Sequence, residues 1–177
     1  YFKHLQSELL GLYMPWYYND FIVNENQRGK YQFCHKFYLN KECSQKYLDL
    51  QETFNIIIQR LNIKNLYRIK ANLNPRSFFN RSGGYHVDNF NCQYTAIYYI
   101  NTNNGCTKLK NNGRVKRVQS IENRMVVFPA NIQHTGHTCT NKSRKVVINF
   151  NFDQHEVSSH LWQTKEKEVC STVCCLL

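Results

Sequence analysis

The sequence has no long hydrophobic run and little proline. Its longest apolar stretches, residues 95–100 and 125–130, are far shorter than the roughly 18 residues that a membrane-spanning helix needs. Only 3 prolines occur among 177 residues, and there is no internal repeat or low-complexity linker. With 42% hydrophobic and 14% aromatic residues, a chain of this length is expected to bury a core of its own as one domain. These features exclude a membrane-embedded or disordered protein.

The sequence also lacks paired-cysteine motifs. Among its 8 cysteines there is no C-x-x-C pair, and five are dispersed along the chain, at Cys34, Cys43, Cys92, Cys106 and Cys139. This pattern favours reduced, mostly buried thiols over a disulfide framework, as is usual for intracellular proteins. We therefore expect a soluble, cytoplasmic protein with no membrane span. The other three cysteines lie in residues 153–177, which we expect to form a C-terminal tail outside the domain.

Acidic residues are scarce. There are 12 Asp and Glu against 23 Lys and Arg, which gives a formal net charge of +11. The cations are scattered, with no block of five or more, and a solvated basic surface accounts for them. Nucleic acid stays open as a partner because of this charge, but no sequence motif supports it. No Ser/His/Asp or paired-carboxylate constellation is present either.

The first third of the sequence predicts helices that support a sheet. Residues 2–13 form the first predicted helix, and Ser44 can cap a second that extends to about residue 61. Within the second helix the apolar positions recur at spacings of four, three and four, at Leu50, Phe54, Ile57 and Leu61. Such a stripe is typical of a helix that packs on a sheet.

From about residue 65 the hydrophobic period changes to two, which indicates strands. The predicted strands are rich in Ile, Val, Tyr and Phe and cover residues 66–73, 93–101, 114–118, 124–128 and 145–152. The segments Asn103-Asn104-Gly105 and Asn111-Asn112-Gly113 separate some of them, and Asn-Gly readily adopts the positive φ angles of tight hairpin turns. We predict an α+β, mainly β protein, with helical support in residues 1–64 and a small antiparallel barrel or sandwich in residues 65–152.

The segment Tyr85-His86-Val87-Asp88 carries the first chemical signal. On an extended strand His86 and Asp88 project from the same face, where an imidazole and a carboxylate can bind a divalent metal. Alone, the pattern fits equally an Asp that hydrogen-bonds a neighbouring His. Downstream, His134 adds a second imidazole, and two His with one carboxylate form the facial triad of non-haem Fe(II) oxygenases. His137 is an alternative third ligand.

A basic residue that could bind an anion follows the second histidine. Arg144 comes ten residues after His134, and on a neighbouring antiparallel strand it would place a guanidinium near the metal. Its planar fork pairs bidentately with a carboxylate, which suits an anionic cosubstrate. We expect the strand face that carries Arg144 to line the barrel interior, together with Val146, Ile148 and Phe150. Lys145 could take its place, but alternation points it to the opposite face.

As an ordered set, these elements resemble the 2-oxoglutarate/Fe(II)-dependent dioxygenases. The set comprises the H-x-D motif, the distal His134 and the basic Arg144 ten positions later. Residues 97–101 (IYYIN) and 123–128 (NRMVVF) resemble the prolyl hydroxylase branch in particular. The resemblance spans residues 66–152, about half the chain. It implies a double-stranded β-helix, also called a jelly roll or cupin-like fold.

The resemblance also implies roles for individual residues. His86, Asp88 and His134 would hold Fe(II), and Arg144 would bind the distal carboxylate of 2-oxoglutarate. Tyr99, the second tyrosine of the Tyr-Tyr pair, would reach the same carboxylate. Prolyl hydroxylases mostly have Lys where this chain has Arg144, which weakens the assignment to that branch but leaves the chemistry unchanged. The spacing of seven from His137 to Arg144 departs from the family pattern, so the resemblance favours His134 as the ligand.

The implied activity is hydroxylation of a C–H bond, with release of succinate and CO2. Peptidyl proline is the leading substrate, so a peptide or protein is the expected partner. Fe(II), 2-oxoglutarate and O2 are the expected cofactors, with ascorbate as a further candidate. The alternatives are a non-catalytic jelly-roll module that binds a metal, an oxygenase that acts on nucleic acid or a free amino acid, and a basic nucleic-acid-binding domain without catalysis.

Overall fold

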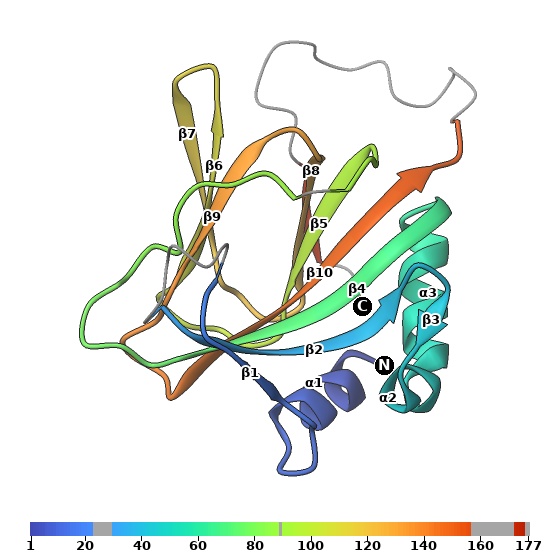
Figure 1. The fold of residues 1–177 in the computed structure, drawn as a ribbon, viewed down its shortest axis with the longest axis horizontal. Coiled ribbons are helices and arrows are strands. Elements are labelled where there is room, and N and C mark those ends of the chain that lie inside the picture. The colour runs from blue at the N-terminus through green and yellow to red at the C-terminus, as the bar shows by residue number, and fades with distance from the viewer. Residues whose placement is uncertain (23–29, 89, 157–171, 176–177) are drawn as a thin grey trace.

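The computed structural model describes residues 1–22, 30–88, 90–156 and 172–175, which form a jelly roll of two facing sheets (Figure 1). The larger sheet has the strand order β1-β2-β4-β10-β5-β8-β11, with β3 paired to β2, and the smaller has the order β7-β6-β9. In chain order the elements are α1 (Phe2–Leu10), β1 (Tyr17–Asn19), β2 (Gln32–Leu39), β3 (Glu42–Cys43), α2 (Gln45–Asp49), α3 (Gln51–Arg60), β4 (Ile63–Pro75), β5 (Tyr94–Tyr99), β6 (Cys106–Asn111), β7 (Arg114–Gln119), β8 (Arg124–Pro129), β9 (Gln133–His137), β10 (Arg144–Gln154) and β11 (Thr172–Cys175).

The helices pack on the outer face of the larger sheet (Figure 1). Ser44 caps α2, because its hydroxyl oxygen accepts a hydrogen bond from the backbone N–H of Tyr47 at 3.2 Å. The single helix expected here is interrupted at Leu50, whose φ of −108° and ψ of 12° separate α2 from α3. The predicted apolar stripe is confirmed, since all four of its residues are buried in the core between helices and sheet, at Leu50, Phe54, Ile57 and Leu61.

Strand β10 contributes apolar side chains to both faces of the larger sheet. Val146, Ile148 and Phe150 lie in the outer core, against the helices. Val147 lies in the inner core, between the two sheets, together with Tyr99 of β5. The expectation that the Val146–Ile148–Phe150 face lines the barrel interior is therefore wrong. Besides Val147, the inner face of β10 carries three polar residues, Lys145, Asn149 and Asn151, and this alternation was a signal that sequence reasoning missed.

All five predicted strands are present, and the structure adds others. The region expected to be helical also contains β1, β2 and β3, and β6 and β9 were not predicted. The hairpin at Asn112-Gly113 is confirmed: it joins β6 to β7, and both residues have positive φ, at 46° and 77°. The expected domain boundary after residue 152 falls inside β10, and β11, in the expected tail, pairs with β8. Most of that tail lies outside the described residues.

Two further observations concern the expected free thiols and the expected lack of a membrane span. The described cysteine side chains are free thiols, at Cys34, Cys43, Cys92, Cys106 and Cys139. Within the described ranges, no helix combines the length and the apolar character that crossing a membrane requires.

Candidate metal centre and pocket

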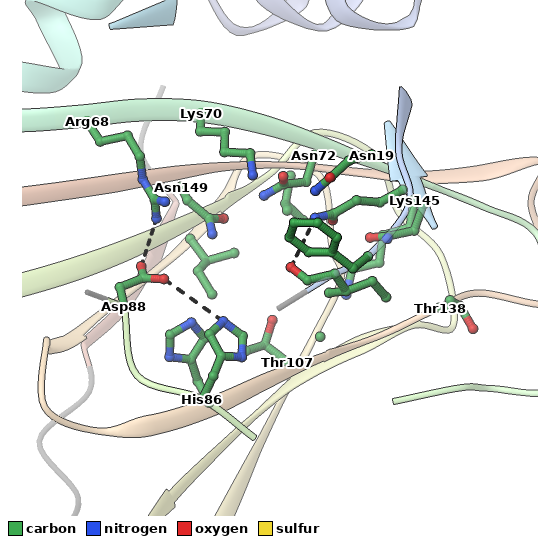
Figure 2. A pocket seen from close by; sticks show the side chains of 18 of the residues that line it. Asn19, Arg68, Lys70, Asn72, His86, Asp88, Thr107, Thr138, Lys145 and Asn149 are labelled. Carbon is green, nitrogen blue, oxygen red and sulfur yellow. Dashed lines mark hydrogen bonds and ion pairs between the residues drawn. The ribbon is translucent and has the colours of Figure 1, made fainter. Parts of the chain in front are cut away.

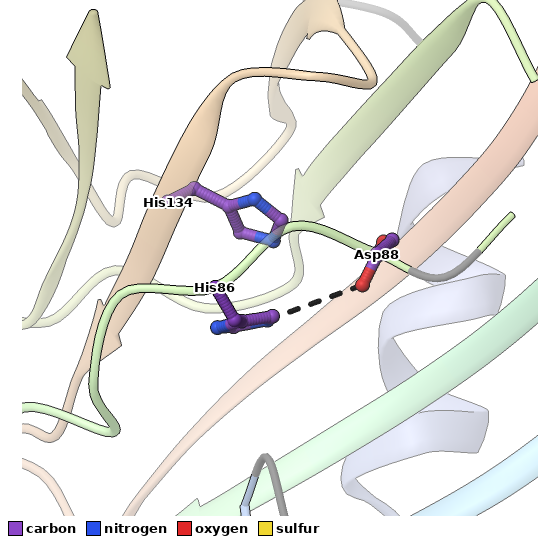
Figure 3. Close-up of side chains that lie close together, drawn as sticks. All are labelled: His86, Asp88 and His134. Atoms are coloured by element: carbon purple, nitrogen blue, oxygen red, sulfur yellow. Dashed lines mark ion pairs between the residues drawn. The ribbon is translucent and has the colours of Figure 1, made fainter.

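His86, Asp88 and His134 converge at the inner side of the jelly roll (Figure 3). His134 lies on β9, and His86 pairs with it through an isolated bridge, in which each backbone N–H donates to the other's carbonyl oxygen at 3.0 and 2.9 Å. The bridge brings the two imidazole rings to 4.4 Å between centroids. One ligand atom from each of the three side chains lies within 4.8 Å of the others. The structure thus brings together the three residues that the sequence singled out.

Both imidazoles are oriented by backbone carbonyls. The Nδ1 atom of His86 lies 3.1 Å from the carbonyl oxygen of Gly84, and that of His134 lies 3.3 Å from the carbonyl oxygen of Ile132. A carbonyl partner places the proton on Nδ1 and leaves the Nε2 lone pair for a metal. The Nε2 atom of His134 is buried and has no hydrogen-bond partner among the described residues. A bound metal ion would satisfy it, so these residues fit a metal.

Among the described residues, hydrogen bonds hold the Asp88 carboxylate through one of its two oxygens. Its Oδ2 accepts hydrogen bonds from Arg68 Nη2 and Asn151 Nδ2, both at 2.9 Å. Arg68 Nε in turn donates to Asn151 Oδ1 at 2.8 Å, which closes a three-residue network. The other oxygen, Oδ1, faces His86 Nε2 at 3.9 Å. The network fixes the carboxylate and leaves Oδ1 available as a ligand.

Electrostatics put two of the three candidate ligands, Asp88 and His134, in the protonation states that metal binding requires. Burial would raise the pKa of Asp88, but the Arg68 guanidinium and the neighbouring groups outweigh it, and the pKa lies below its usual value. Asp88 is therefore an anion at neutral pH. Burial, reinforced by nearby His86, lowers the pKa of His134 to about 4, so this imidazole is neutral. Neutral imidazole with carboxylate is a donor set suited to divalent iron.

His137 does not join this group. It lies three residues after His134 on β9, so its side chain leaves the strand on the opposite face. Its pKa is lowered by burial and then by the charge of Lys108, which pairs on β6 with Thr135. Of the two candidate histidines, the structure places His134 beside His86 and Asp88.

Arg144 points away from the pocket, contrary to expectation. Its Nη2 donates to the carbonyl oxygen of Leu10, the last residue of α1. This contact places a cation at the C-terminal end of a helix that has no basic residue in its own last turn. The cause is strand alternation: Arg144 shares its face with the residues that the helices cover. Arg144 thus ties β10 to α1.

Lys145, on the opposite face of β10, is the cation that lines the pocket. Its Nζ donates to the backbone carbonyl oxygens of Cys106 at 2.8 Å and His137 at 3.0 Å. An ammonium has three donors, so one stays available to a group in the pocket. Burial lowers the pKa of Lys145 to about 8. Tyr99 lies beside it, with its ring centre 5.9 Å from Nζ, and burial raises the pKa of its phenol.

The pocket has a volume of about 300 Å³ and reaches from the three metal-binding candidates to Lys145 (Figure 2). Most of its polar lining was missed by sequence reasoning, including Arg68, Lys70, Asn72, Thr107 and Asn149. A signal for the first three was present. In residues 68–73 (RIKANL) polar and apolar residues alternate, and the apolar ones are buried in the helix-side core. The polar positions therefore had to face inward.

Comparison with known proteins supports the same fold. No family model matches the sequence, and no curated protein matches it. Among solved structures, a 2OG-Fe(II) oxygenase family protein from Burkholderia pseudomallei is similar, with a TM-score of 0.62 and 10% identity over 86% of this chain and 79% of that chain. A Trichoplax adhaerens prolyl hydroxylase in complex with a hypoxia inducible factor peptide fragment has a TM-score of 0.50 and 18% identity, over 69% and 63%. This chain has the fold of the 2-oxoglutarate/Fe(II) oxygenases. The jelly roll predicted from the motif order is thus confirmed.

Proposed function

We propose that this protein is an Fe(II)- and 2-oxoglutarate-dependent dioxygenase that hydroxylates a C–H bond. One observation supports this most strongly. The buried, unpartnered Nε2 of His134 faces His86 and Asp88 in a pocket that also contains Lys145. A pure metal site has no use for a buried ammonium that faces the same cavity. A cosubstrate with a carboxylate at one end and a metal-binding group at the other would use both.

The chain's own residues would bind and orient. His86, Asp88 and His134 would hold the metal through two Nε2 atoms and Oδ1. Arg68 and Asn151 keep Asp88 ionised and turned toward the histidines. With its metal bound, the site would use 2-oxoglutarate and O2 to hydroxylate a C–H bond, with release of succinate and CO2. The protein positions and shields that chemistry, and no protein base has to move a proton.

Lys145 takes the role expected of Arg144. It lies six residues before Asn151 on β10, so the two side chains are on the same face at different depths of the pocket. Its free donor would bind the distal carboxylate of 2-oxoglutarate, with Tyr99 packed against the ammonium. Lysine is also the usual basic residue of the prolyl hydroxylases that the sequence resembles, but Lys145 lies eleven residues after His134, where the family pattern has ten.

The proposed substrate is peptidyl proline. The motif at residues 97–101 supports it, as does the fold likeness to a prolyl hydroxylase whose structure contains a peptide fragment. Ascorbate, expected from the same resemblance, stays a prediction, which assays of succinate release with and without it would test.

The proposal is tested by anaerobic spectroscopy. Fe(II) is added to the protein, then 2-oxoglutarate, and the visible spectrum is recorded. We expect a metal-to-ligand charge-transfer band that is absent in His86→Ala and needs a higher 2-oxoglutarate concentration in Lys145→Met. Bound iron without a band would identify a non-catalytic metal-binding module. Absence of bound iron would overturn the proposal altogether.

A further inference from the structure

The pocket contains a second lysine that the proposed metal and cosubstrate contacts do not use. Lys70 lies on β4 between Arg68 and Asn72, and its side chain points into the pocket (Figure 2). Within the described part of the chain, no hydrogen bond or ion pair engages its ammonium. A largely buried cation without a counter-ion is unfavourable. An anion that enters the pocket would compensate it.

Two unpartnered oxygen atoms lie in the same part of the pocket. The Oδ1 atoms of Asn72 and Asn149 are buried and have no hydrogen-bond partner among the described residues. Asn149 is the direct cross-strand partner of Lys70, and Asn72 is two residues along β4 on the same face. Buried polar atoms are normally hydrogen-bonded, so a ligand with N–H or O–H donors would satisfy these two oxygens. One cation and two acceptors together fit a ligand that has a carboxylate with N–H groups beside it.

The register of β4 and β10 places this cluster close to the metal candidates. Lys145 pairs with Asn74, Val147 with Asn72, Asn149 with Lys70, and Asn151 with Arg68. Each of these pairs faces the pocket. The Lys70 pair is next to the Arg68–Asn151 pair that holds Asp88, and it is two pairs away from Lys145. On the other side of β10, the neighbour of Asn149 is Ile97, which is apolar. The cluster of Lys70, Asn72 and Asn149 thus lies on the β4 side of the line that joins Lys145 to the candidate metal ligands.

The charges around Lys70 favour an anion from outside. Burial lowers its pKa most; Cys34 raises it, and the cations of Arg68 and Lys36 lower it further. The Asp88 carboxylate opposes them, but its Oδ2 is already engaged by Arg68 and Asn151. No other acidic side chain lines the pocket in the ranges described.

We propose that Lys70, Asn72 and Asn149 bind a carboxylate of the primary substrate, and the N–H groups beside it, next to the carbon that is oxidised. This inference rests on the proposed oxygenase function and narrows its peptide substrate to one with an acidic residue beside the oxidised proline. The carboxylate belongs either to an acidic residue of a peptide or to a free amino acid. A pocket of about 300 Å³, part of which 2-oxoglutarate would fill, suits a group the size of one residue.

Binding to the Mn(II)-substituted protein, saturated with 2-oxoglutarate, tests the inference without turnover. The probes are N-acetyl-aspartate N-methylamide, its asparagine isostere and free aspartate, and paramagnetic relaxation of probe protons reports their binding near the metal. We expect the acidic probes to bind at least ten times more tightly than the neutral isostere. Lys70→Met should abolish that preference, and Lys70→Arg should restore part of it. Lys64→Met, an exposed lysine on the same strand, is the matched control and should behave like wild type.

The Kd of 2-oxoglutarate, measured first in the same samples, separates the outcomes. It should change less than twofold in Lys70→Met; a loss above tenfold would make Lys70 a second cosubstrate contact and overturn the inference. Equal binding of the acidic and neutral probes would also overturn it. If N-acetyl-aspartate N-methylamide binds more tightly than free aspartate, the substrate is a peptide. If free aspartate binds more tightly, the substrate is a small molecule. If wild type binds no 2-oxoglutarate, the proposed function fails before any probe is added, and the inference fails with it.

Discussion

Arg68 holds one oxygen of Asp88 and leaves the other free. The guanidinium Nη2 lies 2.9 Å from Oδ2, and both side chains are largely buried. The contact therefore stabilises the ionised form of the Asp88 carboxylate and also fixes its rotation. Residues that orient metal ligands in this way commonly contribute about 10–100-fold to metal affinity.

Arg68→Met is accordingly expected to weaken binding of Fe(II) or Zn(II) by about 10–100-fold. The reason is that Asp88 loses its counter-charge and its fixed orientation, although none of the three candidate ligand side chains is removed. Titration under anaerobic conditions measures the change. Arg114→Met, which removes an exposed arginine from β7, should leave the affinity as it is. An unchanged affinity in Arg68→Met would show that Asn151 alone is sufficient to orient Asp88.

His134→Ala is expected to reduce metal affinity by more than about 100-fold, whereas His137→Ala should retain most of it. His134 presents its buried Nε2 to His86 and Asp88, and His137 lies on the opposite face of β9. Equilibrium dialysis with metal analysis distinguishes the two variants. The reverse result would show that the ligand assignment is wrong.

Lys145→Met should raise the Kd of 2-oxoglutarate by about 10- to 150-fold, the equivalent of one charge-assisted hydrogen bond of about 1.5–3 kcal/mol. Arg144→Met should change this Kd less than about twofold, because its side chain contacts Leu10 instead of the pocket. It should lower the free energy of unfolding by about 0.3–1 kcal/mol, as a cation is lost from the end of α1. Calorimetric titration and urea unfolding test both variants. A larger effect of Arg144→Met on the Kd would restore the expectation from sequence.

Binding of 2-oxoglutarate should weaken as the pH rises through about 8, the pKa of Lys145. Only the ammonium form binds a carboxylate, so the Kd should increase by up to about tenfold per pH unit above that value. His137, whose pKa is lowered, is neutral throughout this window. Titration between pH 7 and 9.5 measures the slope. Lys145→Arg stays charged and should show none.

The stability of the unliganded protein should change in the opposite direction. Because the pKa of Lys145 is lowered from 10.5 to about 8, the folded state binds fewer protons than the unfolded state between these values. Stability attributable to Lys145 therefore rises with pH across this window. Urea unfolding at a series of pH values, with Lys145→Met for comparison, measures it. A decrease that Lys145→Met removes would contradict the buried position of the amine.

Phe54→Ala is expected to cost about 3–5 kcal/mol of unfolding free energy. Phe54 is fully buried, with its ring 5.0 Å from that of Phe37 and 6.4 Å from that of Phe150 on β10, so truncation leaves a cavity between α3 and the sheet. Phe78→Ala removes a ring that is 93% exposed and should change stability by less than about 0.5 kcal/mol. Urea unfolding followed by circular dichroism compares the two.

The sequence predicted the elements whose signals are local. The stripe from Leu50 to Leu61 depends only on helical spacing, and Asn112-Gly113 specifies its hairpin through its own backbone preferences. Strands β2 and β9 were missed, because their segments mix polar and apolar residues and become strands through their neighbours in the sheet. The ligand set was visible as an ordered motif, but Arg68, Asn151 and Lys70 belong to no such motif.

What the sequence by itself determined was the set of candidate metal ligands: His86, Asp88 and His134, in that order and spacing, resemble the metal-binding motif of a family with a jelly-roll fold. What only the tertiary structure decided was which of two neighbouring cations lines the same pocket. Arg144 and Lys145 are adjacent, and alternation fixes only that they face opposite sides of β10. The helices cover one side and the smaller sheet covers the other, so the packing of distant elements, and no local property, directs Lys145 into the pocket and Arg144 to the end of α1.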